Sequence, residues 1–275
     1  MPSPVSPFEP VTVQAIQRAL STSMLGRTLH VHDEVPSTNT LAMTLAQDGA
    51  PHGTVVVADR QTAGRGRLGR HWHSPSGKNL HCSILLRMNV PTARQPLWLS
   101  WVPLIAALAT SRAVQTVAGL KSSVKWPNDI MIADQKLAGI LCESSGLGTD
   151  EMAVIAGIGL NVNIRREEFP DELRAIATSV AIDAGRPWDR TALLAALLLE
   201  FETRCEAFLA GHHGDILTEY MVRCATVGQR VRVELAQGNT LQGRAQSVQP
   251  DGSLRVAQDD GTTTDVRTGD VFHVR

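Results

Sequence analysis

Residues 64–70 read Gly-Arg-Gly-Arg-Leu-Gly-Arg and place three arginines on a short segment that contains three glycines. Glycine accepts backbone angles that other residues avoid, and it lets main-chain amides approach a ligand closely. Each guanidinium offers a planar fork of donors that matches phosphate or carboxylate oxygens. This composition predicts an anion-binding loop, although an isolated Arg-Gly segment is also a common solvated turn.

The glycine spacing of this loop also matches the G-x-G-x-x-G pattern of dinucleotide-binding folds. A strand is predicted before it at 54–59, but that fold requires a helix directly after the third glycine. Residues 71–77 read His-Trp-His-Ser-Pro-Ser-Gly instead, and the proline and glycine argue against a helix. The phosphate-loop pattern also fails, because the Gly-Lys pair at 77–78 is followed by Asn79. Neither nucleotide-binding fold is supported.

Length and composition limit the class of protein. The chain has 275 residues, 43% of them hydrophobic, which suits one large domain or a large and a small one. Its formal charge of −1 gives no general attraction to nucleic acid or to an anionic membrane. No apolar run approaches the roughly 20 residues of a membrane span, and the first ten residues contain four prolines and no basic segment of a secretory signal. We therefore expect a cytoplasmic protein.

The four cysteines, Cys82, Cys142, Cys205 and Cys224, lie far apart and form no C-x-x-C pair. Three of them lie in apolar segments, where a reduced thiol behaves as a small hydrophobe. We expect structural cysteines rather than disulfides or metal ligands.

Hydrophobic periodicity and turn residues predict alternating helices and strands over most of the chain. The predicted helices lie at about 13–24, 40–49, 101–117 and 193–208. The predicted strands lie at 54–59, 80–87, 130–132, 137–142 and 152–158. Within the third helix, Pro103 fits only in the first turn, and a turn at 134–135 joins two strands into a hairpin.

The character of the sequence changes after about residue 225. Short β-branched runs alternate there with turn signals at 238–239, 250–252 and 260–261, which predicts a small all-β module. The fold class is therefore α/β (α+β), with a central mixed or antiparallel sheet, flanking helices and a small C-terminal β-barrel. We expect a proline-rich segment and short helix at 1–30, the main domain at 31–224 and the β-module at 225–275.

Three further segments combine polar groups with apolar strands. Residues 125–129 read Lys-Trp-Pro-Asn-Asp, residues 136–141 read Lys-Leu-Ala-Gly-Ile-Leu, and residues 157–161 read Gly-Ile-Gly-Leu-Asn. A lysine in an apolar strand is unusual, although Lys136 alone also suits an edge position with its amine in water. Asp129 alone also suits a turn cap, and glycines in a strand also mark a bulge.

Taken together and in this order, these segments resemble the signatures of biotin protein ligases, which attach biotin to a carrier protein. The resemblance covers about 37–163 and gains weight from the order of its motifs. The C-terminal module, with Gly-Asp-Val at 269–271, resembles the SH3-like domain of that family through fewer residues. The matching segments are Ser-Thr-Asn at 37–39, Gln61 with the 64–70 loop, Trp-x-Ser-Pro at 72–75, and the segments 125–129, 136–141 and 157–161.

The resemblance implies an ATP-dependent ligase that forms biotinyl-5′-AMP and transfers biotin to one lysine of a carrier protein, such as the biotin carboxyl carrier protein of acetyl-CoA carboxylase. ATP and Mg²⁺ are the implied cofactors. The implied biotin contacts are Ser37, Thr38, Asn39, Gln61, Arg65, Gly66, Arg67, Lys136, Gly139 and Gly157. The implied ATP contacts are Arg67, Arg70, Trp72, Lys125, Asn128, Lys136 and Asn161. The implied catalytic residues are Lys136, Arg65, Arg67 and Asp129, and Asp129 is also the implied metal ligand.

Three other classes of protein remain as alternatives. Family members that repress transcription carry an N-terminal winged helix-turn-helix, but only 36 residues precede the motif at 37–39, so we expect no DNA binding. Lipoate ligases share the fold and the adenylation chemistry, whereas the 64–70 loop and the 125–129 segment are similar to the biotin branch. A binding module without catalysis would not need basic residues that face phosphate. The sequence leaves both a monomer and a homodimer open.

Overall fold

The computed structural model describes residues 10–87, 90–235 and 239–274. Its largest layer is a seven-stranded sheet in the order β1-β2-β3-β7-β6-β5-β4. The first two strands are parallel, and every other neighbouring pair is antiparallel, which confirms the expected mixed sheet. The strands are β1 (Leu29–Val35), β2 (Val55–Gln61), β3 (Leu80–Leu86), β4 (Ser123–Lys125), β5 (Asp129–Ile132), β6 (Gln135–Ser145) and β7 (Ala153–Leu160).

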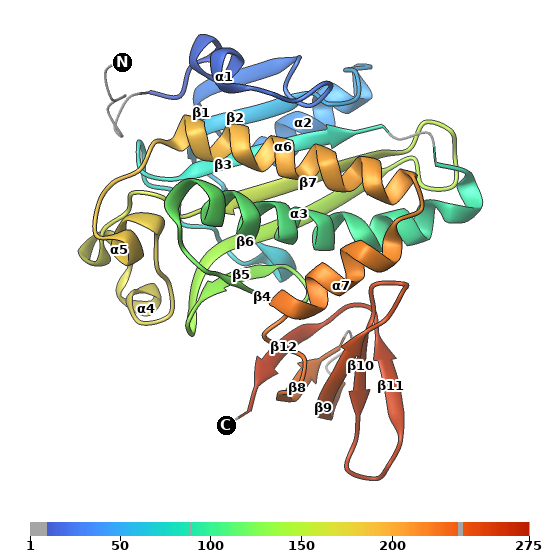
Figure 1. Cartoon of the computed structure of the whole chain (residues 1–275). Coiled ribbons are helices and arrows are strands. Elements are labelled where there is room, and N and C mark those ends of the chain that lie inside the picture. The colour runs from blue at the N-terminus through green and yellow to red at the C-terminus, as the bar shows by residue number, and fades with distance from the viewer. Residues whose placement is uncertain (1–9, 88–89, 236–238, 275) are drawn as a thin grey trace.

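Helices cover the two faces of this sheet to different extents (Figure 1). The long helices α3 and α6 pack on one face and build the main hydrophobic core with it. On the other face, α2 covers one end only, where Ala42 and Ala46 meet Val56, Leu85 and Ile155. The helices are α1 (Val13–Ala19), α2 (Thr38–Gln47), α3 (Gln95–Ala118), α4 (Asp171–Arg174), α5 (Val180–Ala184), α6 (Arg190–Leu209) and α7 (His213–Arg223).

A second, smaller sheet follows α7 and lies below the first in Figure 1. Its order is β11-β10-β9-β8-β12, with antiparallel neighbours throughout, which confirms the expected C-terminal β-module. β11 and β12 are its edge strands. The strands are β8 (Arg230–Glu234), β9 (Thr240–Val248), β10 (Leu254–Ala257), β11 (Thr263–Val266) and β12 (Asp270–His273).

Two buried tryptophans join the small sheet to the large domain. Trp101 of α3 donates its indole hydrogen to the carbonyl of Pro250 at 2.9 Å. Trp126, which follows β4, donates its own to the carbonyl of Gly252 at 3.1 Å. Because a buried indole N–H needs a partner, the turn at 250–252 is held where it satisfies both rings.

The long helix α3 corrects the expected helix at 101–117. It begins at Gln95, with a proline in its first positions, so Pro103 lies in the helix interior rather than in the first turn. An interior proline removes one backbone hydrogen bond and costs about 3 kcal/mol in an exposed helix. Here α3 is largely buried between the sheet and α6, and burial of its apolar side chains offsets that cost.

The burial of α3 also bears on the expectation that the chain has no membrane span. The segment Thr92–Ala118 is long and apolar enough to cross a membrane, but 72% of its most apolar window is buried inside the protein. In this protein the segment is a core helix of the large domain.

The first helix is shorter than expected, because it ends at Ala19 and leaves Met24 52% exposed. The following turn is fixed by Glu202 of α6, whose carboxylate accepts the backbone N–H groups of Ser23, Met24 and Leu25. A carboxylate that takes three amides holds this segment against α6, and apolar spacing does not predict such a contact.

The other predicted helices and strands lie close to their expected places, whereas α4, α5 and α7 were not predicted. The second helix begins at Thr38, two residues early, because Ser37 caps it through the N–H of Thr40. The hairpin forms between β5 and β6, although the turn falls one residue earlier, where Ala133 has a positive φ of 49°. β1 and β4 were not predicted, since β1 is a half-exposed edge strand and β4 has only three residues.

The described cysteines are all free, as expected. Most of the proline-rich segment, at 1–9, and Gly238 of the expected turn at 238–239 lie outside the described residues.

Candidate active site

A cavity of about 650 Å³ opens on the sheet face that α2 leaves uncovered. It extends from the start of α2 to the first residues of β12 in the small sheet. Every site residue that the sequence predicts lines it, although these residues come from seven segments of the chain. They are Ser37, Thr38, Asn39, Gln61, Arg65, Gly66, Arg67, Arg70, Trp72, Lys125, Asn128, Asp129, Lys136, Gly139, Gly157 and Asn161.

One end of the cavity is a hydrogen-bonded network of polar groups at the start of α2. Gln61 accepts hydrogen bonds through Oε1 from the backbone N–H of Thr38 at 2.8 Å and from its hydroxyl at 3.1 Å. Asn39 donates to the carbonyl of Leu141 at 3.0 Å and to Glu143 at 2.7 Å. The buried hydroxyl of Ser83 lies 2.8 Å from Thr38 Oγ1 and 2.7 Å from Asn39 Oδ1. This end suits a small polar ring with both donors and acceptors.

Glycines on the central strands form the floor of the cavity. A Cβ at Gly157 would lie 2.0 Å from Asn39 Oδ1, so only glycine leaves room for that amide. Gly139 and Gly159 are register partners on β6 and β7, and Trp72 lies over both. A Cβ would lie 2.6 Å from the indole at Gly159 and 3.1 Å from it at Gly139. The indole rests directly on backbone, which explains why these strands carry glycines.

The arginine loop is a tight hairpin beside this floor. The N–H of Gly66 donates to the carbonyl of Arg70 at 2.7 Å, and the N–H of Trp72 donates to that of Gly64 at 2.9 Å. At the tip, Leu68 has a positive φ of 55° and is 75% exposed. The flanking glycines allow this turn, but a leucine in the left-handed region is itself strained.

The three arginines of the loop point to different partners. Arg65 forms an ion pair with Glu143 at 2.9 Å. Arg67 donates to Asn128 Oδ1 and to the carbonyl of Gly269, both at 3.0 Å.

The third arginine of the loop, Arg70, pairs with Asp270 of the small sheet. The loop therefore contacts both the 125–129 segment and the small sheet.

The base of the loop is held by a buried serine and histidine. Ser74 Oγ accepts the N–H of Gln61 at 2.8 Å and lies 2.6 Å from His81 Nε2. Burial lowers the pKa of His81 to about 4, so its imidazole is neutral near pH 7. The hydrogen bond between the serine hydroxyl and the neutral ring fixes the chain just after Trp72.

Basic side chains outnumber carboxylates in the lining of the cavity. Its lining includes five basic side chains, Arg65, Arg67, Arg70, Lys125 and Lys136, against three carboxylates, Asp129, Asp134 and Asp270. Lys136 Nζ lies 2.6 Å from Asp129 Oδ1 and 5.6 Å from the centre of the Trp72 ring. Burial lowers the pKa of Lys125, whose amine lies 5.9 Å from the Phe272 ring.

Two asparagines of the cavity are occupied by contacts within the protein. Asn128 accepts from Arg67 and donates to the carbonyl of Ile140 at 2.8 Å. Asn161 donates to the carbonyl of Thr178 at 3.0 Å and accepts from Asn79 at 3.2 Å. Both amides hold neighbouring segments in place, in addition to any role toward a ligand.

Asp129, the expected metal ligand, is one of the three carboxylates that line the cavity. Within the described ranges, no group of three or more His, Cys, Asp or Glu side chains is arranged to hold a metal ion. Mg²⁺ is commonly bound by one or two carboxylates together with phosphate oxygens and water. Asp129 therefore fits Mg²⁺ that arrives with a nucleotide, and not a metal held by protein alone.

Two segments of the chain match known families. Residues 31–161 match the Biotin/lipoate A/B protein ligase family, and residues 226–274 match the Biotin protein ligase C terminal domain. The chain is 33% identical over 266 residues to the biotin--[acetyl-CoA-carboxylase] ligase of Mycobacterium tuberculosis, across 94% of this chain and 96% of that protein. The chain belongs to the biotin protein ligase family.

Two other relatives are similar to this ligase, one by sequence and one by structure. It is 37% identical over 246 residues to the bifunctional ligase/repressor BirA of Bacillus subtilis, across 90% of this chain and 74% of that protein. A biotin protein ligase from Aquifex aeolicus, in complex with biotin and ATP, has a TM-score of 0.76 at 29% identity, across 90% of this chain and 99% of that chain. The predicted family, enzyme class and fold are confirmed.

Sequence reasoning missed two parts of the lining of the ligase cavity, and it missed the buried Ser83 behind the lining residues Thr38 and Asn39. Ser83 lies in a segment predicted only as an apolar strand, although a lone serine in the run Leu80–Leu86 was a signal. The segment around α4 adds an apolar wall of Phe169, Leu173, Ile176 and Ala177. The small sheet adds Asp270, Val271 and Phe272.

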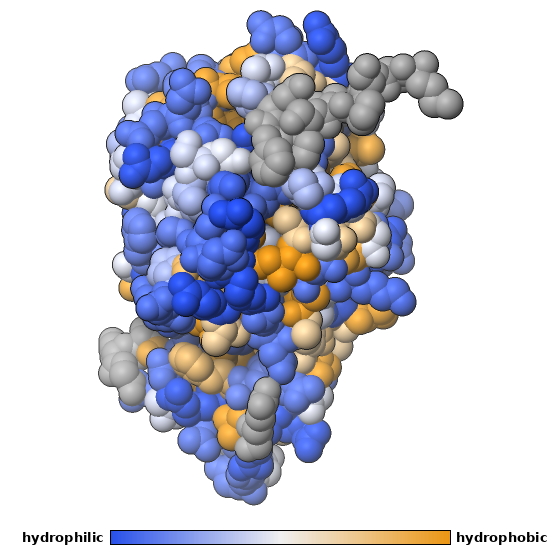
Figure 2. All heavy atoms as spheres, turned by 90° about the vertical axis from the view of Figure 1, so that its left-hand side faces the viewer, coloured by the Kyte–Doolittle hydropathy of each residue, from blue (hydrophilic) through white to orange (hydrophobic). Residues whose placement is uncertain are grey.

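The apolar wall is tied to the backbone of Lys136. The N–H of Lys136 donates to the carbonyl of Ile176 at 2.8 Å, and the N–H of Thr178 donates to the carbonyl of Lys136 at 2.9 Å. Ile176 is 58% exposed. From the side of α4 and α5, an apolar patch lies midway down the molecule among hydrophilic residues (Figure 2).

Proposed function

We propose that this ligase joins biotin to ATP to form biotinyl-5′-AMP, and that it then transfers biotin to a lysine of a carrier protein. The observation that carries the proposal is one cavity with a network of hydrogen-bonding groups at α2 and a cluster of cations that includes the arginine loop. Biotin has a polar ureido ring and a carboxylate, so it matches both. The Aquifex aeolicus relative in complex with biotin and ATP supports this assignment.

The polar end would hold the biotin ring system. Thr38, Asn39 and Gln61 offer hydroxyl and amide groups whose orientation is fixed by each other and by Ser83. Glycine at 157 lets the ring lie close to the strand backbone. A preorganised set of polar groups rejects ligands without matching donors and acceptors, because those groups would be left unpaired.

The first reaction step brings together two anions. A biotin carboxylate oxygen attacks the α-phosphorus of ATP, the bond to the β-phosphate oxygen breaks, and pyrophosphate leaves. Lys136, Arg65 and Arg67 lie where they can stabilise the negative charge on the carboxylate and the α-phosphate. Fixed cations of this kind lower the barrier without having to reorganise. Mg²⁺, when bound through Asp129 and the phosphates, would neutralise further charge.

The nucleotide would occupy the far end of the cavity. Trp72 and the wall formed by Leu173 and Ile176 supply apolar surfaces for the adenine. Arg70 and Lys125 supply positive charge for the phosphates, and Asn128 and Asn161 hold the surrounding segments.

The second step needs an uncharged amine at the carbonyl of the anhydride. A lysine side chain in water has a pKa of about 10.4, so the acceptor lysine is mostly protonated near pH 7. Asp129 is the carboxylate placed to attract that ammonium group and to take its proton. The amine then forms the amide bond, and AMP leaves.

A transfer assay tests the proposal. The protein is incubated with ATP, Mg²⁺, labelled biotin and a biotin-carrier domain, and the expected result is label on a single lysine. A folded protein that transfers no label would contradict the proposal. Lipoate is the matched competitor, because the lipoate-ligase alternative predicts that lipoate competes with biotin in pyrophosphate exchange.

We also propose that the enzyme acts in the cytoplasm, with a catalytic domain at 31–224 and a docking module at 225–275. The free, mostly buried cysteines are in keeping with a reducing compartment. The expected absence of DNA binding stays a prediction.

A further inference from the structure

Three basic side chains that line the cavity lie next to the start of β12 in the small sheet. Arg70 forms an ion pair with Asp270, the first residue of β12. Arg67 donates to the carbonyl of the preceding Gly269 at 3.0 Å. The amine of Lys125 lies 5.9 Å from the ring of Phe272. The start of β12 is therefore the part of the small sheet that faces the proposed phosphate site.

The carboxylate of Asp270 lines the cavity but is nearly buried. Its side chain is 8% exposed, whereas the side chain of its partner Arg70 is 62% exposed. Burial of a carboxylate is costly unless a cation or hydrogen bonds compensate. Arg70 supplies that compensation, and Asp270 also raises the pKa of Lys125 against the larger effect of burial.

The position of this carboxylate is set by the small sheet rather than by the loop. Asp270 is the register partner of Glu234 on β8. A Cβ at Gly269 would lie 2.8 Å from Val233 Cγ1 and 2.9 Å from the carbonyl oxygen of Glu234. The backbone before Asp270 therefore lies tightly against β8, and its carboxylate is held toward Arg70.

We propose that Asp270 is an internal counter-anion that competes with nucleotide phosphates for Arg70. The inference rests on the proposed ATP site. A phosphate that enters between Arg67, Arg70 and Lys136 needs the guanidinium group that Asp270 already holds. Arg70 must exchange Asp270 for the phosphate, so part of the phosphate affinity is lost in breaking the pair. Nucleotide binding thereby releases the start of β12 from the loop.

Calorimetric titration of the full chain with ATP and with inorganic pyrophosphate tests this competition. EDTA is included, so that no metal ion bridges the ligand to Asp270. Asp270→Asn keeps the shape and removes the charge, and we expect its Kd for both ligands to fall roughly three- to tenfold. The Kd for biotin should change less than the Kd for either phosphate ligand, because Arg70, the partner of Asp270, is assigned to the phosphates and not to the biotin carboxylate.

Two further variants make the test specific. Asp265→Asn removes a carboxylate of the same sheet that pairs with Arg255 at 2.7 Å and does not line the cavity, so it should leave all affinities unchanged. In the Arg70→Gln background, Asp270→Asn should bring no gain. A gain without Arg70 would mean a general effect of charge and would overturn the proposal.

Unchanged or weaker phosphate binding by Asp270→Asn would also overturn it. Weaker binding would show that Asp270 assists the ligand. If wild type bound neither ATP nor pyrophosphate and formed no biotinyl-5′-AMP, the proposed function would fall together with this inference.

Asp270→Ser serves if Asp270→Asn does not fold, because it also removes the negative charge. Unchanged or weaker phosphate binding by Asp270→Ser would then overturn the proposal.

Discussion

Lys136 is a cation that we assign to both the biotin carboxylate and the α-phosphate of ATP. Its amine pairs with Asp129 at 2.6 Å, and its backbone is hydrogen-bonded to the apolar wall at Ile176. Its side chain is only 34% exposed, so the amine is held in one region of the cavity. Such a fixed cation stabilises charge that develops in the transition state more than charge in the ground state.

Replacement of Lys136 by alanine should therefore impair chemistry more than folding. Loss of one preorganised donor typically lowers a rate by roughly 10² to 10³, or about 3 kcal/mol, and we expect this loss in biotin-dependent pyrophosphate exchange. Lys121→Ala removes an exposed lysine and is the matched control. Near-normal exchange by Lys136→Ala would refute the role.

Gly157 is the residue that gives Asn39 its place. An alanine Cβ would lie 2.0 Å from Asn39 Oδ1, so the amide must move and lose its contact with Ser83. We expect Gly157→Ala to weaken biotin binding about 5- to 150-fold, since one displaced buried hydrogen bond costs about 1 to 3 kcal/mol.

Gly214→Ala is the control for this substitution, because its Cβ would meet nothing within 4 Å. Biotin titration of both variants decides the point. Equal affinity of Gly157→Ala and wild type would show that Asn39 does not contact biotin.

At the scale of elements, the arginine loop depends on the strand that follows it. β3 places His81 under the loop, where the ring meets Ser74. Because burial lowers the pKa of His81 from 6.5 to about 4, the folded protein keeps the ring neutral in a range where the unfolded chain protonates it. The unfolded state therefore binds more protons between pH 6.5 and 4, and stability falls as the pH falls through this window.

This shift predicts a loss of about 3 kcal/mol in the free energy of unfolding between pH 6.5 and pH 4 that depends on His81. His81→Gln keeps a side chain that can hydrogen-bond to Ser74 but removes the titrating ring. Urea unfolding at several pH values should show a shallower pH dependence in this variant than in wild type. The same slope in both proteins would mean that His81 is not the group responsible.

The elements also show which parts of the site were accessible to sequence reasoning. A glycine or lysine within an apolar strand, or several arginines in a glycine-rich loop, departs from the ordinary local pattern and can be recognised in the sequence. The residues recognised in this way line the cavity. Asp270 was matched only as part of the Gly-Asp-Val segment of the C-terminal module and not as a site residue, and Ile176 carries no signal. They reach the cavity through long-range contacts of β12 and of the segment after α4, which depend on how distant segments pack.

The same reason explains the errors in the predicted fold. Local propensity predicted Pro103 in the first turn of its helix and Met24 within the first helix. In the structure, burial stabilises α3 with Pro103 in its interior, and Glu202 holds Met24 in a turn after the first helix. Tertiary contacts override propensity where they are strong.

At the scale of the whole molecule, the small sheet is part of the same hydrophobic core as the large domain. Val231 and Leu254 belong to the core cluster that contains Trp101 and Trp126. Removal of the small sheet would expose these large rings to water, at a cost of roughly 25 cal/mol per Å². The contribution of the small sheet to function is therefore better tested by substitution than by deletion.

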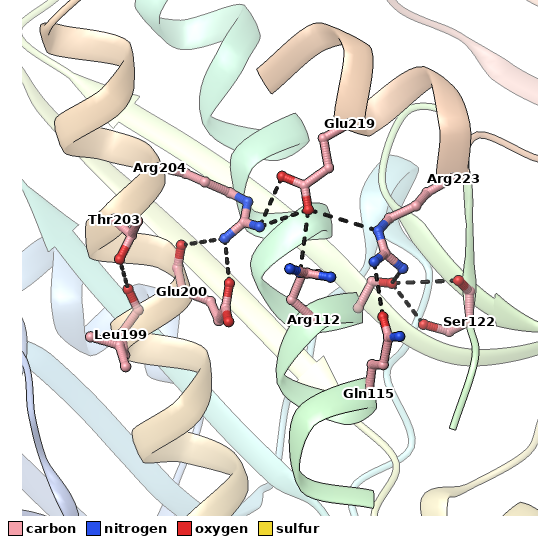
Figure 3. Close-up of polar contacts among 10 residues, drawn as sticks. Arg112, Gln115, Ser122, Leu199, Glu200, Thr203, Arg204, Glu219 and Arg223 are labelled. Carbon is pink, nitrogen blue, oxygen red and sulfur yellow. Dashed lines mark hydrogen bonds and ion pairs between the residues drawn. The ribbon is translucent and has the colours of Figure 1, made fainter. Parts of the chain in front are cut away.

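The helix α7 connects the large domain to the small sheet, and a cluster of charges holds it (Figure 3). Glu219 of α7 accepts two hydrogen bonds from Arg204 of α6, at 2.8 and 2.9 Å. It also lies 3.4 Å from Arg112 of α3 and 3.8 Å from Arg223. One carboxylate therefore faces three guanidinium groups from three helices. Directly after α7, the N–H of Ala225 donates to the carbonyl of Val124, which joins this helix to the sheet edge.

Glu219→Gln should destabilise the protein by about 1 to 3 kcal/mol, because Arg204 is only 8% exposed and would keep its charge with one carboxylate fewer. The control is Glu34→Gln, which breaks an ion pair with Arg60 whose side chains are about half exposed and should cost less than about 0.5 kcal/mol. Urea unfolding at pH 7 measures both. Equal losses in the two variants would mean that the cluster adds nothing beyond an ordinary surface pair, and that α7 is held by its apolar contacts alone.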